Sequence, residues 1–256
     1  MLKAYRLLTF AVLTAGLMLM PARAAQTGAS SPDTQIQADV QKALGGKKFR
    51  DVKVSAQNGV VALSGTVHLY IDKHDAGNKA QRSKDVKSVQ NEIVVAGTTV
   101  EDSVLEKKLA RSVDSDRTDT SNVMFEAVIT TVKDGVVTMN GYVSRPQDKD
   151  YLFGEVANYP GVKDVVDHIE VTSQSGGDNR IRTDAVRTIF SARQLSRYYS
   201  DPGKPIRIIV NDGTILLVGV VATQSDKDVA GTQANLVRGV SNVINNLDVA
   251  GAAPEK

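Results

Sequence analysis

The residues with the clearest chemical potential are arginines that gather between positions 180 and 197, followed by two adjacent tyrosines. A guanidinium pairs well with phosphate oxygens, and a tyrosine ring suits the headgroup zone of a membrane. This stretch could therefore bind an anionic surface; the alternative is an ordinary solvated helix face. The candidate residues are Arg180, Arg182, Arg187, Arg193, Arg197, Tyr198 and Tyr199.

A second basic group lies ahead of the first predicted hairpin. It consists of Lys47, Lys48, Arg50 and Lys53. Each basic side chain near an anionic surface contributes about 1 kcal/mol, so either group would give weak, salt-sensitive docking. Here too the alternative is a solvated surface.

Other chemistries find little support among the residue types. The chain has no Cys, and its three histidines, His68, His74 and His168, fit no zinc spacing and no catalytic triad. It also has no Trp to stack on bases. We therefore expect no enzyme activity, no metal, no cofactor and no nucleic-acid partner.

Three internal repeats must position these residues. Five positions recur three times, and each interval is counted from the position before it. A glycine is followed six residues later by a second glycine, seven further on by an Asp-Lys pair, seventeen further on by Val and four further on by an aliphatic residue. The starting points of the copies are Gly59, Gly135 and Gly213. The glycines expected to be structural are Gly59, Gly65, Gly135, Gly141, Gly213 and Gly219.

Each repeat reads as helix, strand, strand, helix, strand. We expect Asp33, Asp102 and Asp178 to be N-caps of the first helices, and Asn-Gly or Asp-Gly turns to join the first two strands. The glycine inside the second strand should allow a helix to approach closely. The second helix should end at Gly161 and Gly239, and less definitely at Asp85 in the first repeat.

The fold class that follows is α+β, with three tandem α-β-β-α-β modules. Each module should pack two helices on one face of a three-stranded mixed sheet, with a right-handed crossover before the last strand. The predicted boundaries are residues 33–97, 100–174 and 178–250.

These motifs resemble the BON domain family, named for bacterial osmotically inducible and nodulation proteins. The resemblance rests on the turn glycine, the Val61–Val67 type of strand with its internal glycine, and the final Val-x-x-x-Ile strand. The chain is similar to periplasmic, osmotically inducible members of this family, although its three copies of the domain depart from the usual pair. The resemblance implies a non-catalytic envelope protein that binds anionic phospholipid through a helix, which favours the arginine-rich stretch.

The first 24 residues predict a cleavable signal peptide. Lys3 and Arg6 precede an apolar run, Leu7 to Met20, that is too short to span a bilayer, and Ala22-Arg23-Ala24 fits a cleavage site. Without Cys the protein cannot be a lipoprotein. We therefore expect an exported, periplasmic protein.

Charge separates the three modules. The chain without residues 1–24 keeps 28 of 31 basic groups against 29 acids, and the modules carry +3, −6 and +2 in order. We expect the basic modules to support binding to anionic phospholipid or a membrane surface, for envelope integrity or osmotic stress tolerance. The acidic module would then be a spacer or a protein-binding unit. The alternative is a periplasmic protein-interaction scaffold or chaperone-like adaptor that binds envelope proteins, which the repetition and the exposed edges of three-stranded sheets indicate.

Overall fold

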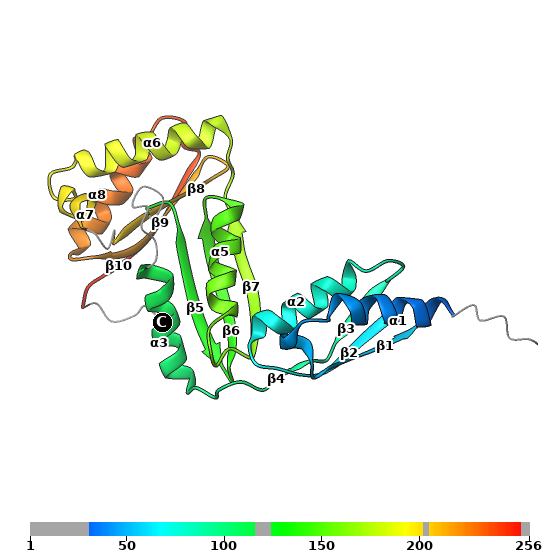
Figure 1. Ribbon diagram of the computed structural model, residues 1–256. Helices are drawn as coiled ribbons and strands as arrows, with labels where there is room; N and C mark the ends of the chain where they lie inside the picture. The colour runs from blue at the N-terminus through cyan, green and yellow to red at the C-terminus, as the bar shows by residue number, and fades with distance from the viewer. Residues whose placement is uncertain (1–30, 116–123, 202–204, 252–256) are drawn as a thin grey trace, which may run out of the picture.

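The computed structural model describes residues 31–115, 124–201 and 205–251, which form three α+β modules in tandem (Figure 1). Module 2 lies between the other two. Module 1 comprises α1 (Pro32–Ala43), the 3-10 turn η1 (Lys47–Phe49), β1 (Val52–Gln57), β2 (Val60–Val67), α2 (Tyr70–Gln81), β3 (Ser88–Asn91) and β4 (Val94–Val95). Module 2 comprises α3 (Asp102–Ser115), β5 (Ala127–Lys133), β6 (Val136–Val143), α5 (Pro146–Ala157) and β7 (Asp164–Val171). Module 3 comprises α6 (Gly176–Ser191), α7 (Ser196–Ser200), β8 (Ile206–Asn211), β9 (Thr214–Val221), α8 (Gln224–Asn235) and β10 (Asn242–Val249).

The second strand of each module is the centre of a mixed sheet. It pairs antiparallel with the first strand through the hairpin and parallel with the last strand, as in β5–β6 and β6–β7. In module 1 the last strand is interrupted, so β3 and β4 both pair with β2. The predicted fold class is confirmed.

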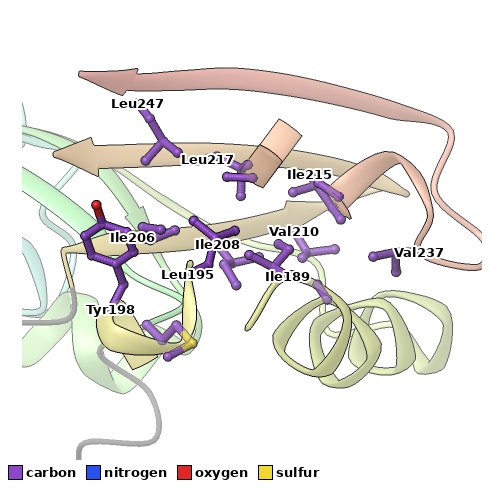
Figure 2. Close-up of a cluster of buried hydrophobic side chains, with 14 of the residues drawn as sticks. Ile189, Leu195, Tyr198, Ile206, Ile208, Val210, Ile215, Leu217, Val237 and Leu247 are labelled. Atoms are coloured by element: carbon purple, nitrogen blue, oxygen red, sulfur yellow. The ribbon is translucent and has the colours of Figure 1, made fainter. Parts of the chain in front are cut away.

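The helices of each module cover one face of its sheet and bury an aliphatic core. The apolar residues that follow the aspartate of each first helix by three, seven and eleven positions share one helical face and are buried in all three copies, as at Leu105, Leu109 and Val113 of α3. Figure 2 shows the corresponding core of module 3, in which Ile189 of α6 packs with Ile208, Ile215 and Leu217 of the sheet.

The carboxylate at the start of each first helix joins that helix to the hairpin. In module 1, Asp33 accepts hydrogen bonds from the backbone N–H groups of Asn58, at 2.8 Å, and Gly59, at 2.9 Å. Asp102 binds the turn of module 2 at 2.6 and 2.9 Å, and Asp178 binds that of module 3 at 3.1 and 2.8 Å. We call this contact the turn clamp.

The turn clamp corrects the prediction that these aspartates are N-caps. The cap of α1 is Ser31, whose hydroxyl accepts from Thr34 N, and the cap of α6 is Ser175, which accepts from Asp178 N. Each aspartate lies within the first turn of its helix, or at its first residue in α3, and its side chain reaches across to the hairpin. A sequence pattern alone does not distinguish the two roles, because the partners of the carboxylate lie 25 to 35 residues away.

The glycine inside the second strand has a different function from the one predicted. Gly65, Gly141 and Gly219 have φ values of +105°, +133° and +123°. A Cβ on any of them would lie within 2.0 Å of a backbone carbonyl oxygen that precedes or begins the first strand, for example that of Ala127 opposite Gly141. Strand backbone, and not a helix, makes the close approach.

The second helices end earlier than predicted. Helix α5 ends at Ala157 and α8 at Asn235, each with an αR residue as C-cap, and a further turn separates these ends from Gly161 and Gly239. Asp85 takes the same left-handed conformation in module 1, at φ 63°, after a helix end of the same form. The predicted difference at Asp85 is therefore wrong.

Replacing the clamp carboxylate should destabilise module 3. Asp178 is 2% exposed, and Asp178→Asn would place an amide N–H against a backbone donor, at a cost of about 1–3 kcal/mol in unfolding free energy. Urea denaturation measures this loss. The control is Asp184→Asn on the same helix, which changes charge equally but leaves the clamp intact and should cost far less.

The effect of Asp178→Asn should depend on pH. Burial raises the pKa of Asp178, but hydrogen bonds from Ser173, Gly213, Asp212 and Ser175 outweigh it and hold the pKa below its ordinary value of 3.8. The stabilisation is thus present above pH 3.8 and lost as pH falls through the lowered pKa. The difference between wild type and variant should shrink in that acid range, and a constant difference would contradict the clamp.

Candidate functional site

The arginine-rich stretch divides into buried and exposed residues. Arg182 is 6% exposed and cannot contact a membrane surface. One guanidinium nitrogen donates to Thr172 Oγ1, Ser173 O and Val210 O, at 2.7 to 3.0 Å. Arg182 therefore ties the segment that joins modules 2 and 3 to the end of β8, which corrects its assignment to the lipid site.

Tyr198 is also a structural residue. Its ring lies in the core of module 3 beside Ile206 (Figure 2), and its hydroxyl donates to Asp226 Oδ2 at 2.9 Å and accepts from Ala222 N at 2.8 Å. Arg197 donates to the same carboxylate oxygen at 2.5 Å and stacks over the tyrosine ring. Burial raises the pKa of Asp226, but bonds from Thr223 and Tyr198 and the charge of Arg197 leave it lowered.

The remaining members of the stretch are exposed on the helical side of module 3. Arg180 and Arg187 are seven residues apart on α6 and therefore share one side of that helix. Arg193 follows α6, and Tyr199 is 50% exposed with its ring 5.4 Å from that of Phe190. A surface of arginines and a half-exposed tyrosine remains, although Asp184 lies 3.8 Å from Arg187.

The basic group of module 1 is partly neutralised by neighbouring acids. Lys48 lies 3.0 Å from Asp72 and 2.7 Å from Asp75, and Arg50 lies 3.2 Å from Asp51. Lys47 and Lys53 are exposed. This group therefore presents less free positive charge than its composition suggested.

An aromatic contact between modules 1 and 2 has no counterpart in the predictions. Tyr70 of α2 is 8% exposed and belongs to the core cluster of module 2. The ring of Phe153 on α5 lies 6.3 Å from that of Tyr70 and 4.7 Å from that of His74.

The sequence did contain a signal for this contact. Phe153 stands where modules 1 and 3 have Gly77 and Gly231, each packed against an asparagine amide that leaves no room for a Cβ. A large aromatic residue at a position that is otherwise glycine indicates a surface specific to that module.

Three stretches of the chain match the sequence signature described as the BON domain: residues 32–97, 101–173 and 181–251. One match falls on each module. The chain belongs to the BON domain family. The resemblance predicted from the triple repeat is thereby confirmed, and BON domains are non-catalytic domains associated in general with phospholipid or membrane binding.

Two solved structures similar to this BON protein are of CdsD, a structural protein of the type III secretion system of Chlamydia trachomatis. One is 14% identical, covers 85% of this chain and 93% of that chain, and has a TM-score of 0.25. The other, of the C-terminal domain, is 16% identical, covers 83% and 96%, and has a TM-score of 0.23. No curated protein matches the chain.

Within residues 31–115, 124–201 and 205–251, no group of three or more His, Cys, Asp or Glu side chains is placed to hold a metal ion. In the same residues, no helix has the length and apolar character that crossing a bilayer requires. The predicted signal peptide lies outside the described residues.

Tyr70 should remain protonated at a pH that ionises ordinary tyrosines. Burial, followed by the charge of Asp164, raises its pKa from 10.0 to about 12. The neutral phenol is the form that packs between the BON modules, so this contribution to stability is present below pH 10 and lost as pH rises towards 12. Ultraviolet titration of tyrosinate measures the ionisation.

Wild type and Tyr70→Phe should therefore titrate alike up to about pH 11 and diverge only above it. In strong urea the variant should instead lack one tyrosine that ionises at its ordinary value. A difference between the folded proteins near pH 10 would show that Tyr70 is not buried at the junction.

Proposed function

We propose that this protein is a non-catalytic, exported BON protein that binds anionic phospholipid at the cell envelope and supports envelope integrity under osmotic stress. The observation that carries the proposal is the exposed arginine surface on the helical side of module 3. We define that surface as Arg180, Arg187, Arg193 and Arg197 with Tyr199. Family membership supports it, because lipid association is general among BON domains.

The chemistry of this surface suits a lipid headgroup. Guanidinium groups bind phosphate oxygens with paired hydrogen bonds, and Tyr199 offers an apolar ring with a polar tip. Four arginines at about 1 kcal/mol each would give weak docking that falls with salt. Arg197 contributes least, since Asp226 already holds its guanidinium.

The geometry leaves this surface accessible. Helices α6 and α7 lie on the side of the module 3 sheet that faces away from module 2 (Figure 1). Docking through this side therefore does not require the modules to separate.

The proposed location is the periplasm. It is supported by residues 1–24, whose charged start, apolar run and small-residue site have the form of a signal peptide. An exported protein would meet anionic phospholipid at the membrane surface, which agrees with the proposed binding.

Neutralising three of the exposed arginines should abolish most vesicle binding. The triple variant Arg180→Gln, Arg187→Gln, Arg193→Gln should bind vesicles of mixed neutral and anionic phospholipid more weakly by about 3 kcal/mol at low salt. Co-sedimentation measures the bound fraction. Binding by wild type should fall as salt rises and be absent on purely neutral vesicles.

A matched triple variant on module 2 provides the control. Lys107, Lys108 and Arg111 are exposed on α3, and their replacement by Gln changes net charge by the same amount. This control should bind the mixed vesicles at least as well as the wild type does. Equal losses in the two variants would mean that only net charge matters, and binding to neutral vesicles would refute headgroup recognition.

A further inference from the structure

A groove of about 440 Å³ lies where the sheet of module 2 meets that of module 3. Its walls belong to the faces of the two sheets that no helix covers. Ala127, Ile129 and Tyr142 supply apolar surface from module 2, and Val218 supplies it from β9. The volume falls in the range of ligand-sized clefts.

The apolar character of the groove continues along both walls. On the module 2 face, Ile129 is 66% exposed; on the module 3 face, Val220 is 49% and Ile244 is 42% exposed. Val220 and Ile244 alternate with core residues along their strands, so they share the open face of the module 3 sheet with Val218. Aliphatic side chains on an open sheet face favour neither folding nor solubility unless something covers them.

Module 1 shows that the fold does not require these aliphatic residues. The modules are aligned here on the glycine inside the second strand and on the residues paired with that strand. In this alignment Lys53 occupies the position of Ile129. Ser64 and Thr66 occupy the positions of Val218 and Val220. Gln90 stands in the place of Ile244. The same scaffold therefore tolerates polar residues at these four positions, and aliphatic residues there are specific to modules 2 and 3.

Contacts between modules 2 and 3 hold the two walls of the groove in place. Ile209 lies on the open face of β8, yet it is 2% exposed. Asn211, on the same face, accepts a hydrogen bond from Ser173 N of the connecting segment at 2.8 Å, and Met124 O accepts from Ile208 N at 2.7 Å. Arg182 also links the connecting segment to β8. The groove is therefore preformed.

The charges at the edge of the groove select the ligand. Glu170 lines it, Asp248 is exposed beside Val220 on the neighbouring strand, and the ring of His168 is 3.3 Å from Asn140 Oδ1. Arg207 on the module 3 face is half-buried and already engaged in another interaction. The accessible charge next to the apolar walls is thus negative, which disfavours an anionic headgroup.

We propose that this groove binds an amphipathic segment of a partner protein, with aliphatic side chains between the walls and Lys or Arg side chains facing Glu170 and Asp248. Charge complementarity commits the site to a cationic segment. The site is separate from the arginine surface of α6 and does not depend on lipid binding. One molecule could then hold a membrane surface on one side and a protein on the other.

Two synthetic helical peptides of about four turns test the proposal. One carries Leu on one face and Lys on the other, and its counterpart carries Glu in place of every Lys. Fluorescence anisotropy with the full chain should show that the Lys peptide binds at least about tenfold more tightly than the Glu peptide. Equal binding of the two peptides would overturn the charge assignment.

Variants then locate the binding site. Ile129→Ser should weaken the Lys peptide about tenfold because it removes apolar surface from the wall, and Glu170→Gln should weaken it and reduce its salt dependence. The control is Val94→Ser in module 1, which is 61% exposed and outside the groove, and should bind as wild type. If Val94→Ser loses as much affinity as Ile129→Ser, or Ile129→Ser loses none, the groove is not the site. Circular dichroism verifies that each variant is folded, and vesicle binding should be unchanged in all three.

Discussion

The turn clamp is the contact on which each module depends. A carboxylate in the first turn of the first helix binds two adjacent N–H groups of the hairpin, and so joins the start of the module to the middle of its sheet. The chain between the two ends is 26, 33 and 35 residues long in the three copies. Because the clamp fixes both ends, this segment can vary in length at a small entropic cost. In module 1 it holds the basic residues around η1, and in module 3 it holds α7 with Tyr198.

The modules are joined by residues that depart from the repeat. Phe153 replaces a glycine of the other copies and meets Tyr70, whose ring enters the core of module 2. At the other junction Arg182 donates three hydrogen bonds to the connecting segment and β8, and Asn211 receives a fourth contact from that segment. An arginine is well suited to this position because its planar group can satisfy several carbonyls at once. These contacts turn three similar domains into an arrangement with distinct surfaces.

Two of those surfaces have opposite chemistry and lie on opposite sides of module 3. The helical side carries exposed arginines and Tyr199, which suit phosphate and an interfacial zone. The open side of the sheet carries Val218, Val220 and Ile244, with acids nearby. The two proposals together describe an adaptor between a membrane and a protein, and they combine the two functions that the sequence analysis gives as alternatives.

The sequence by itself determined what repeats: the family, the α-β-β-α-β order, the hairpin turns and the buried helical face. Those features depend on local periodicity and on residues such as Gly59 whose backbone conformation is special. Only the tertiary structure decided which side chains of the arginine stretch are available, because Arg182 and Tyr198 find partners 9 to 28 residues away in sequence. It also decided that Asp33 clamps a turn, that the in-strand glycine admits a strand carbonyl, and that Ile129 and Val218 share a groove. Each of these depends on contacts between segments that are distant along the chain, and a periodic pattern holds no information about which distant groups meet.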